Sequence, residues 1–369
     1  MMTDYRLTSL AKSLPDTVPF VGPETQERAR SRLFDARLGA NENVFGPSPT
    51  AVRAMAETQH WMYGDPESFE LREALADHNG ITPDMIVVGE GIDALLGYLV
   101  RIMVAPGDAV VTSDGAYPTF NYHVAGYGGV LHKVPYRYDD HEDAVALFKR
   151  AAKVDAKLVY LANPDNPMGT ALSGAEIVEA LEYLPDGTLL VLDEAYLECA
   201  TQNIALPLPL DDPRVIRLRT FSKAYGLAGA RVGYAMGAPG LIRAFEKVRN
   251  HFGMNRAAQA GALAALEDQT WLRSVQARIA ASRNRIAEIA RKNGLRTLPS
   301  HTNFVTIDCG SGPEFAKAVL NEIVARGVFI RMPFVAPQNR CIRISCGRPA
   351  QLDILTEVIP LALRAAELR

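Results

Sequence analysis

The sequence predicts an α/β fold: a large domain with a mostly parallel seven-stranded sheet between helices, followed by a smaller α+β domain. The 369 residues exceed the roughly 150 that one domain commonly takes. From residue 85 to residue 237, short runs of apolar and β-branched residues alternate with helical patterns. After about residue 250 this alternation stops, and helical stretches precede strand-like runs. Such a change of pattern indicates two domains of different architecture.

Seven runs form the candidate strands of the large domain. They lie at 85–89, 109–113, 130–134, 157–162, 189–196, 215–220 and 232–237. Most are apolar along nearly their whole length, which is typical of parallel strands that helices cover on both faces. Ligands of open α/β sheets bind beyond the carboxyl ends of the strands, so we expect the functional residues there.

The rest of the chain forms an N-terminal arm and the second domain. We expect residues 1–35 to be an extended arm that packs on the small domain or on a partner subunit. The large domain then takes residues 36–250, and the small domain takes residues 251–369. The expected elements of the small domain are helices at 257–268 and 270–294, strands at 304–309, 327–331 and 341–346, and a last helix at 350–368. Pro360 should kink or interrupt that last helix.

Composition excludes several kinds of partner. The formal net charge is −3, the pI is about 6.2 and no block is rich in Lys or Arg, so we expect no nucleic-acid partner. No segment has the ~18 consecutive apolar residues of a membrane span, and the N-terminus lacks a secretion-signal pattern. We therefore expect a cytoplasmic protein. The four cysteines lack metal-binding spacing, so we expect no metal. With nucleic acid, membrane and metal disfavoured, we expect the partner to be a small molecule.

The segment TFSKAYGLAGARVGY, residues 220–234, carries a concentration of polar groups directly after a strand. Thr220 and Ser222 supply hydroxyls, Lys223 an amine and Arg231 a guanidinium. Two hydroxyl groups and the bidentate guanidinium of an arginine suit a phosphate group. A lysine beside them could form an imine with the aldehyde of a cofactor. The alternative is a solvated basic loop, which is the usual meaning of an isolated lysine among glycines.

This segment resembles the cofactor-lysine signature of fold-type I aminotransferases, S-K-x-x-G-L-A-G-x-R, which depend on pyridoxal 5′-phosphate (PLP). The resemblance extends over nearly the whole chain. It implies that Lys223 holds PLP as an imine and, once substrate amine displaces it, moves a proton as general base and acid. It also implies that Thr220, Ser222 and Arg231 hold the cofactor phosphate.

Two further motifs match the same family. In LLVLDEAY, the resemblance implies that Asp193 pairs with the protonated pyridine nitrogen and that Tyr196 donates to the phenolate oxygen of PLP. In NPDNPMGT, residues 163–170, it implies that Asn166 bonds the same oxygen. Taken alone, an acid that ends a strand could be a Mg²⁺ ligand or a helix N-cap, and two Asn-Pro pairs could mark only a turn.

The loop in VVGEGIDALLGYLV, residues 87–100, supports a rival interpretation. Gly89, Gly91 and Ala94 fit the dinucleotide fingerprint, and Asp114 ends the next strand about 20 residues on, as a ribose-binding acid would. A nicotinamide-dependent dehydrogenase, however, leaves the other motifs unexplained. The resemblance to aminotransferases implies instead that this loop binds the cofactor phosphate through backbone amides at a helix N-terminus. Those amides belong to Gly91, Ile92 and Asp93.

Two aromatic positions follow from the resemblance. In YPTFNY, residues 117–122, the aromatic ring that stacks on the cofactor is Phe120, with Tyr122 as the alternative. Tyr63, in WMYGDPES, matches the tyrosine that reaches the cofactor phosphate of the neighbouring subunit in homodimeric relatives. The resemblance therefore implies a homodimer with active sites at the subunit interface.

Within the family, LGANENVFGPSP, YGDPE and HTNFVTID most resemble the histidinol-phosphate aminotransferases. In CIRISCG, Arg343 matches the arginine that binds the acidic end of the substrate, and Arg331 in GVFIRMPF matches a second anion-binding arginine. Asn41 borders the substrate side of the pocket. Surface arginines are the alternative for both positions.

The predicted function is a ping-pong transamination in amino-acid biosynthesis, in which PLP passes an amino group from histidinol phosphate to a 2-oxo acid such as 2-oxoglutarate. Aromatic or other amino acids are alternative donors, and a PLP lyase such as a threonine-phosphate decarboxylase is a second alternative. A non-catalytic PLP sensor with a DNA-binding head is disfavoured, because the roughly 35 residues that precede the globular pattern are too few for a winged-helix domain.

Overall fold

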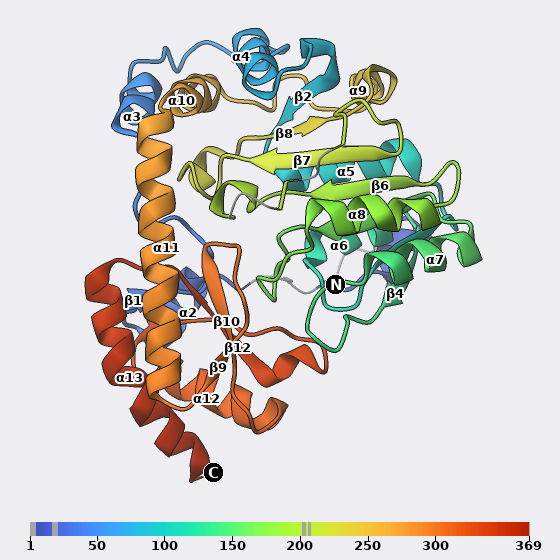
Figure 1. Cartoon of the computed structure of the whole chain (residues 1–369). Coiled ribbons are helices and arrows are strands. Elements are labelled where there is room, and N and C mark those ends of the chain that lie inside the picture. The colour runs from blue at the N-terminus through green and yellow to red at the C-terminus, as the bar shows by residue number, and fades with distance from the viewer. Residues whose placement is uncertain (1–4, 17–20, 201–203, 206–207, 369) are drawn as a thin grey trace.

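The computed structural model describes residues 5–16, 21–200, 204–205 and 208–368. Figure 1 shows a sheet with helices on both faces, and a second body built on smaller sheets. The long helix α11 (Gln269–Lys292) runs from beside the shorter helices α3 (Pro49–Ala56) and α10 (Arg256–Glu267) down to the second body. No helix of the described residues is long and apolar enough to cross a membrane.

The large sheet has seven strands and is mostly parallel, which confirms the predicted fold class. Its order is β2-β8-β7-β6-β5-β3-β4, and only β8 runs antiparallel to its neighbours. The strands are β2 (Ile86–Gly89), β3 (Ala109–Ser113), β4 (Val130–Val134), β5 (Leu158–Ala162), β6 (Leu189–Asp193), β7 (Val215–Thr220) and β8 (Gly233–Met236). The seven runs of the sequence match these strands closely.

Burial on both faces explains why the strand sequences are continuously apolar. On β5, Leu158, Tyr160 and Ala162 belong to one core, whereas Val159 and Leu161 belong to the core on the opposite face. This alternation follows from the two-residue period of a strand. The helices around the sheet are α3 (Pro49–Ala56), α4 (Phe69–Asn79), α5 (Ile92–Met103), α6 (Pro118–Gly126), α7 (Ala144–Val154), α8 (Gly174–Ala180) and α9 (Pro239–Phe245).

The second body combines helices with two small sheets. Antiparallel strands form one sheet in the order β12-β10-β9, and β1 pairs in parallel with β11 in the other. The elements are β1 (Ala36–Arg37), α11, β9 (Arg296–Thr297), β10 (Phe304–Asp308), α12 (Pro313–Ala325), β11 (Val328–Phe329), β12 (Cys341–Ser345) and α13 (Pro349–Glu367). Helix α10 (Arg256–Glu267) lies beside α3 instead (Figure 1). Pro360 was expected to kink or interrupt the last helix, and α13 is not interrupted there, because it continues through Pro360.

The N-terminal segment is more helical than the extended arm that we expected. It contains α1 (Ser9–Ser13) and α2 (Pro23–Arg30). Buried Glu27 accepts a hydrogen bond from the backbone nitrogen of Phe34 at 2.9 Å and forms an ion pair with Arg37. The Phe34 ring packs 5.3 Å from that of Phe329, so this segment contacts the second body.

Contacts cross both expected domain limits. Residues 36–37 pair with β11 of the second body, while Ala258 and Ala262 of α10 share a core with Ala51 of α3 in the large domain. The division at residues 35 and 250 therefore stays a prediction, and we propose that the boundary lies nearer the start of α11.

Candidate active site

A cavity of about 500 Å³ lies at the carboxyl ends of β5, β6 and β7, the edge that the strand pattern predicts. Its walls come from the loops after these strands, the start of α5, residues 39–42 and residues 331–335. Twelve of the residues predicted from the sequence line it: Asn41, Ile92, Asp93, Asn166, Asp193, Tyr196, Thr220, Ser222, Lys223, Arg231, Arg331 and Arg343.

Lys223 lies in the loop after β7, with its amine inside the cavity. Its Nζ donates a hydrogen bond to the backbone oxygen of Asn41 at 3.3 Å and lies 5.3 Å from the centre of the Tyr196 ring. Burial, together with the positive charge of Arg343, lowers the pKa of Lys223 to about 8. A larger share of this lysine is therefore neutral near pH 7 than of an exposed lysine, and the neutral amine is the nucleophile.

A corner of the cavity fits a phosphate. The hydroxyl of Thr220 donates to that of Ser222 at 2.9 Å, and Arg231 donates to the Ser222 hydroxyl at 3.4 Å. Gly91, with φ of +84°, precedes the N-terminus of α5, and a Cβ built there would lie 2.5 Å from the Arg231 guanidinium. The absence of a side chain at Gly91 thus allows Arg231 to approach the backbone amides at the start of α5. The guanidinium and these amides together suit a dianion such as a phosphate.

Asp193 ends β6 as a buried carboxylate with two donors. The Tyr160 hydroxyl donates to its Oδ2 at 2.6 Å, and the Ala195 backbone nitrogen donates to its Oδ1 at 2.9 Å. Burial raises the pKa of Asp193 to about 6. A cation held against this carboxylate would restore the ionised form, which suits a protonated ring nitrogen.

Asn41 connects the lysine to the opposite wall. Its backbone has a φ of +55°, and its side-chain nitrogen donates to the Tyr196 hydroxyl at 3.1 Å. Ser345 of β12 donates to the Asn41 side-chain oxygen at 2.7 Å, and Asn303 donates to the Asn41 backbone oxygen at 2.9 Å. Burial raises the pKa of Tyr196, so its hydroxyl stays protonated and can donate.

The two predicted anion-binding arginines lie side by side. The Arg343 backbone nitrogen donates to the Arg331 oxygen at 2.6 Å, and the Arg331 nitrogen donates to the Arg343 oxygen at 3.2 Å. The Arg343 guanidinium also donates to the side-chain oxygen of Asn166, and its Nε is buried without a partner among the described residues. Burial lowers the pKa of Arg343 to about 10, which leaves it cationic at neutral pH. Arg331 donates to the Val21 oxygen at 2.8 Å.

The structure corrects the predicted stacking aromatic. Phe120 is 0% exposed and does not line the cavity, because it points into the core and stacks on Tyr160 with ring centres 4.8 Å apart. Tyr122 is 42% exposed and also lies outside the cavity lining. The aromatic residue that lines the cavity from this segment is Tyr117, at the N-cap of α6. Its place directly after the turn that follows β3 was the signal that the sequence analysis missed.

Gly91 and Tyr63, which were also predicted to bind the cofactor, do not line the cavity. Gly91 is not in the cavity lining, although it borders Arg231 as described. Tyr63 is 77% exposed, lies outside the cavity lining and packs 5.0 Å from the ring of Phe252. Tyr160 was missed, because nothing in a buried strand marks one tyrosine as the partner of the acid on the next strand.

Comparisons with known proteins agree on one family. A model of the family described as aminotransferase class I and II matches residues 36–359. Histidinol-phosphate aminotransferase 2 of Carboxydothermus hydrogenoformans is 33% identical over 349 residues, 92% of this chain and 95% of that protein. Histidinol-phosphate aminotransferase of Roseiflexus castenholzii is 36% identical over 331 residues, 88% of each chain.

Solved structures show the same likeness. The crystal structure of histidinol-phosphate aminotransferase from Sinorhizobium meliloti in complex with pyridoxal-5′-phosphate is 50% identical, with a TM-score of 0.95 over 100% of both chains. A single mutant of Thermus thermophilus aspartate aminotransferase is 22% identical with a TM-score of 0.82, over 98% of this chain and 100% of that chain, and shares the fold.

We expect PLP to attach to the cofactor-free protein at a rate that rises with pH through a midpoint near 8, because only the neutral Lys223 amine attacks an aldehyde. Stopped-flow absorbance in the visible region measures this rate. Arg343→Gln should move the midpoint upward, since Arg343 is the second cause of the lowered pKa. A wild-type midpoint near that of an ordinary lysine, about 10.4, would contradict the account.

Proposed function

The chain belongs to the class I and II aminotransferases, and from this premise we propose that it transfers the amino group of histidinol phosphate to a 2-oxo acid such as 2-oxoglutarate, with PLP as cofactor. The observation that carries the proposal is the adjacent pair Arg331 and Arg343 in the same cavity as Lys223. The names of the relatives support the same substrate and cofactor.

The residues present fit PLP. The phosphate-binding corner of Thr220, Ser222 and Arg231, with the backbone amides of Gly91, Ile92 and Asp93, would take the phosphate. When bound, PLP supplies an aldehyde carbon that amines attack and a pyridine ring that accepts electron density from the bond being broken. We assign the ring contact to Tyr117 instead of Phe120, because Tyr117 lines the cavity.

The protein's own groups then hold and move protons. Asp193 would hold a proton on the pyridine nitrogen. The two hydrogen bonds that its carboxylate accepts, and the positive charge of the protonated nitrogen facing it, favour the ionised form of Asp193. Tyr196 would donate a hydrogen bond from its hydroxyl to the phenolate oxygen of PLP, and Asn166 would bond the same oxygen. Lys223, once its amine is free, would take the proton from the α-carbon of the amino donor and return it to the carbon that was the aldehyde carbon of PLP. A pKa of about 8 suits an amine that accepts and releases a proton near neutral pH.

The two arginines select the substrate. Arg343 and Arg331 would bind the phosphate group of histidinol phosphate, and the partnerless Nε of Arg343 is a donor that such an anion would satisfy. Asn41, beside Lys223 and Tyr196, limits the reacting end of the pocket. A site with two buried or half-buried guanidinium groups discriminates strongly against a neutral substrate group.

A spectral titration tests the substrate. The PLP-loaded protein is mixed with histidinol phosphate, phenylalanine, tyrosine, glutamate or O-phosphothreonine, and the visible absorption band is followed. We expect histidinol phosphate to shift the band at the lowest concentration and 2-oxoglutarate to reverse the shift. A shift with phenylalanine or tyrosine but not with histidinol phosphate would sink the substrate assignment. Release of carbon dioxide from O-phosphothreonine would favour the lyase.

A homodimer is also part of the proposal. Trp61 and Tyr63 are 81% and 77% exposed, and Met62, Phe69 and Phe252 are exposed as well. An exposed group of large apolar side chains on a soluble enzyme is typical of a protein interface. We propose that a second copy covers it and that Tyr63 reaches the cofactor phosphate of that copy. Cytoplasmic residence stays a prediction from the sequence.

Sedimentation of the PLP-loaded protein should give a dimer, and Tyr63→Phe should remain a dimer that binds PLP several-fold more weakly, because only the phenol hydroxyl is lost. Ultracentrifugation and PLP titration measure the two properties. A monomer at micromolar concentration, or wild-type PLP affinity in Tyr63→Phe, would rule out this arrangement.

A further inference from the structure

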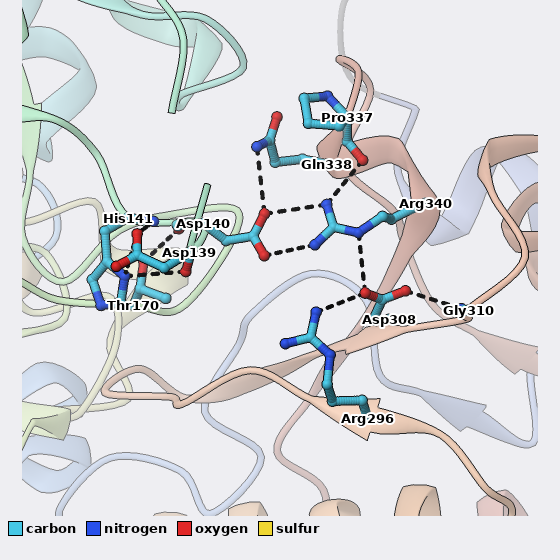
Figure 2. Close-up of polar contacts among 10 residues, drawn as sticks. All are labelled: Asp139, Asp140, His141, Thr170, Arg296, Asp308, Gly310, Pro337, Gln338 and Arg340. Carbon is cyan, nitrogen blue, oxygen red and sulfur yellow. Dashed lines mark hydrogen bonds and ion pairs between the residues drawn. The ribbon is translucent and has the colours of Figure 1, made fainter. Parts of the chain in front are cut away.

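An ion-pair network outside the cavity joins the two bodies of the molecule (Figure 2). Asp140, only 3% exposed, accepts two hydrogen bonds from Arg340, to Oδ1 at 3.2 Å and to Oδ2 at 2.6 Å. The Arg340 Nε donates to Asp308 Oδ2 at 3.0 Å, and Arg296 donates to the same oxygen at 2.8 Å. The two-bond geometry and the burial of Asp140 distinguish this pair from the exposed ion pairs that contribute little.

On the large-domain side, the network leads to the turn that carries Asn166. Asp140 has a φ of +64°, and its backbone oxygen accepts a hydrogen bond from the Thr170 hydroxyl at 3.0 Å. The Thr170 backbone oxygen accepts from the Asp165 nitrogen at 2.9 Å, which closes the turn over residues 165–170. Asn166, inside this turn, holds the Arg343 guanidinium. A single hydrogen bond, from Thr170, thus connects Asp140 to the turn that contacts Arg343.

On the other side, Arg340 ends the segment that walls the cavity. This segment leaves the Arg331–Arg343 backbone bridge, lines the cavity with residues 332–335, and returns to β12 through Arg340. Arg340 donates to the Pro337 oxygen at 3.0 Å, and the Asn339 nitrogen donates to the Val335 oxygen at 2.9 Å. The position of residues 332–335 therefore depends on where Arg340 is held.

We propose that Asp140 and Arg340 are positioning residues that fix the 331–343 segment, and with it both substrate arginines, against the large domain. This rests on the proposed function, because it assigns substrate binding to Arg331 and Arg343. Neither Asp140 nor Arg340 lines the cavity. Their effect passes through the backbone of the 331–343 segment. A small displacement of that segment weakens substrate binding, because two guanidinium groups must both contact one anion.

The groups that anchor the cofactor should be insensitive to this pair. Asp193 ends β6, and Lys223 and the side chains of the phosphate-binding corner lie at the end of β7 and on the loop after it. None of them bonds to Asp140 or Arg340 in the described structure. Loss of the pair should therefore raise the KM of the substrate and leave the affinity for PLP unchanged. A merely stabilising pair would lower the melting temperature without that split.

The experiment compares three variants with a matched control in the same network. Asp140→Asn keeps the size of the side chain and tolerates the positive φ. Arg340→Lys keeps the charge but not the two-bond fork, and the double variant Asp140→Asn/Arg340→Gln leaves no lone buried charge if either single variant fails to fold. The control is Arg296→Gln, because Arg296 bonds Asp308 but does not reach Asp140.

Steady-state kinetics use the amino donor to which the wild type responds, and hydrogen–deuterium exchange of the PLP-loaded protein follows the amides of residues 331–335. We expect about tenfold higher KM, kcat within about threefold, an unchanged affinity for PLP and faster exchange in the Asp140 and Arg340 variants. Arg296→Gln should match the wild type.

Wild-type KM and exchange in a folded variant, or equal changes in Arg296→Gln, would overturn the positioning role. Failure of the proposed function is recognised separately, because the wild type would then not respond to histidinol phosphate. The exchange measurement needs no substrate and decides the inference in that case as well.

Discussion

The backbone oxygen of Asn41 accepts hydrogen bonds from Lys223 at 3.3 Å and from Asn303 at 2.9 Å, and much of the site depends on this shared acceptor. Lys223 lies on the loop after β7 of the large sheet, and Asn303 precedes β10 of the second body. Asn41 itself comes from the segment that follows β1, which pairs with β11. Asn41 therefore links the Lys223 amine to the wall that carries Ser345 and Arg343.

Positive charge is concentrated in this cavity. Arg231, Arg331 and Arg343 line it together with Lys223, and the proximity of Arg343 contributes to the lowered pKa of the lysine. A cofactor phosphate and an acidic substrate group would balance these charges, so the arrangement favours dianionic ligands over neutral ones. Asp193 gives the opposite field at the end of β6, where a protonated ring nitrogen would fit. The cavity thus separates an anion-binding role from a cation-binding role.

The sequence predicted the sheet well because burial on both faces leaves an unmistakable continuous apolar pattern, as on Leu158 to Ala162. It failed where the outcome depends on which way a side chain points. Phe120 and Tyr117 lie three residues apart at the start of one helix, and only the packing of Phe120 on Tyr160 decides which ring faces the cavity. The two-residue strands β1 and β9 also carry too little pattern to be recognised, whereas β11 lies inside the predicted run 327–331.

Contacts distant in sequence were equally invisible. Asp140 and Arg340 are separated by 200 positions, and each alone is typical of an exposed charge in a loop. The residues that line the cavity could be predicted because their motifs are local and each matches a chemical need of one cofactor. Residues that position those groups have no such local pattern, since their role exists only in the folded arrangement.

The central claim is that Lys223 is the residue that holds PLP. Borohydride reduces the carbon–nitrogen double bond between PLP and its lysine to a stable linkage, which peptide mass spectrometry then locates. The cavity offers two lysines among the residues that line it, Lys223 and Lys133, and Lys133 is paired with Asp114 at 3.1 Å. The account predicts the label on the peptide that contains Lys223, and a label on Lys133 or on any other lysine would contradict it.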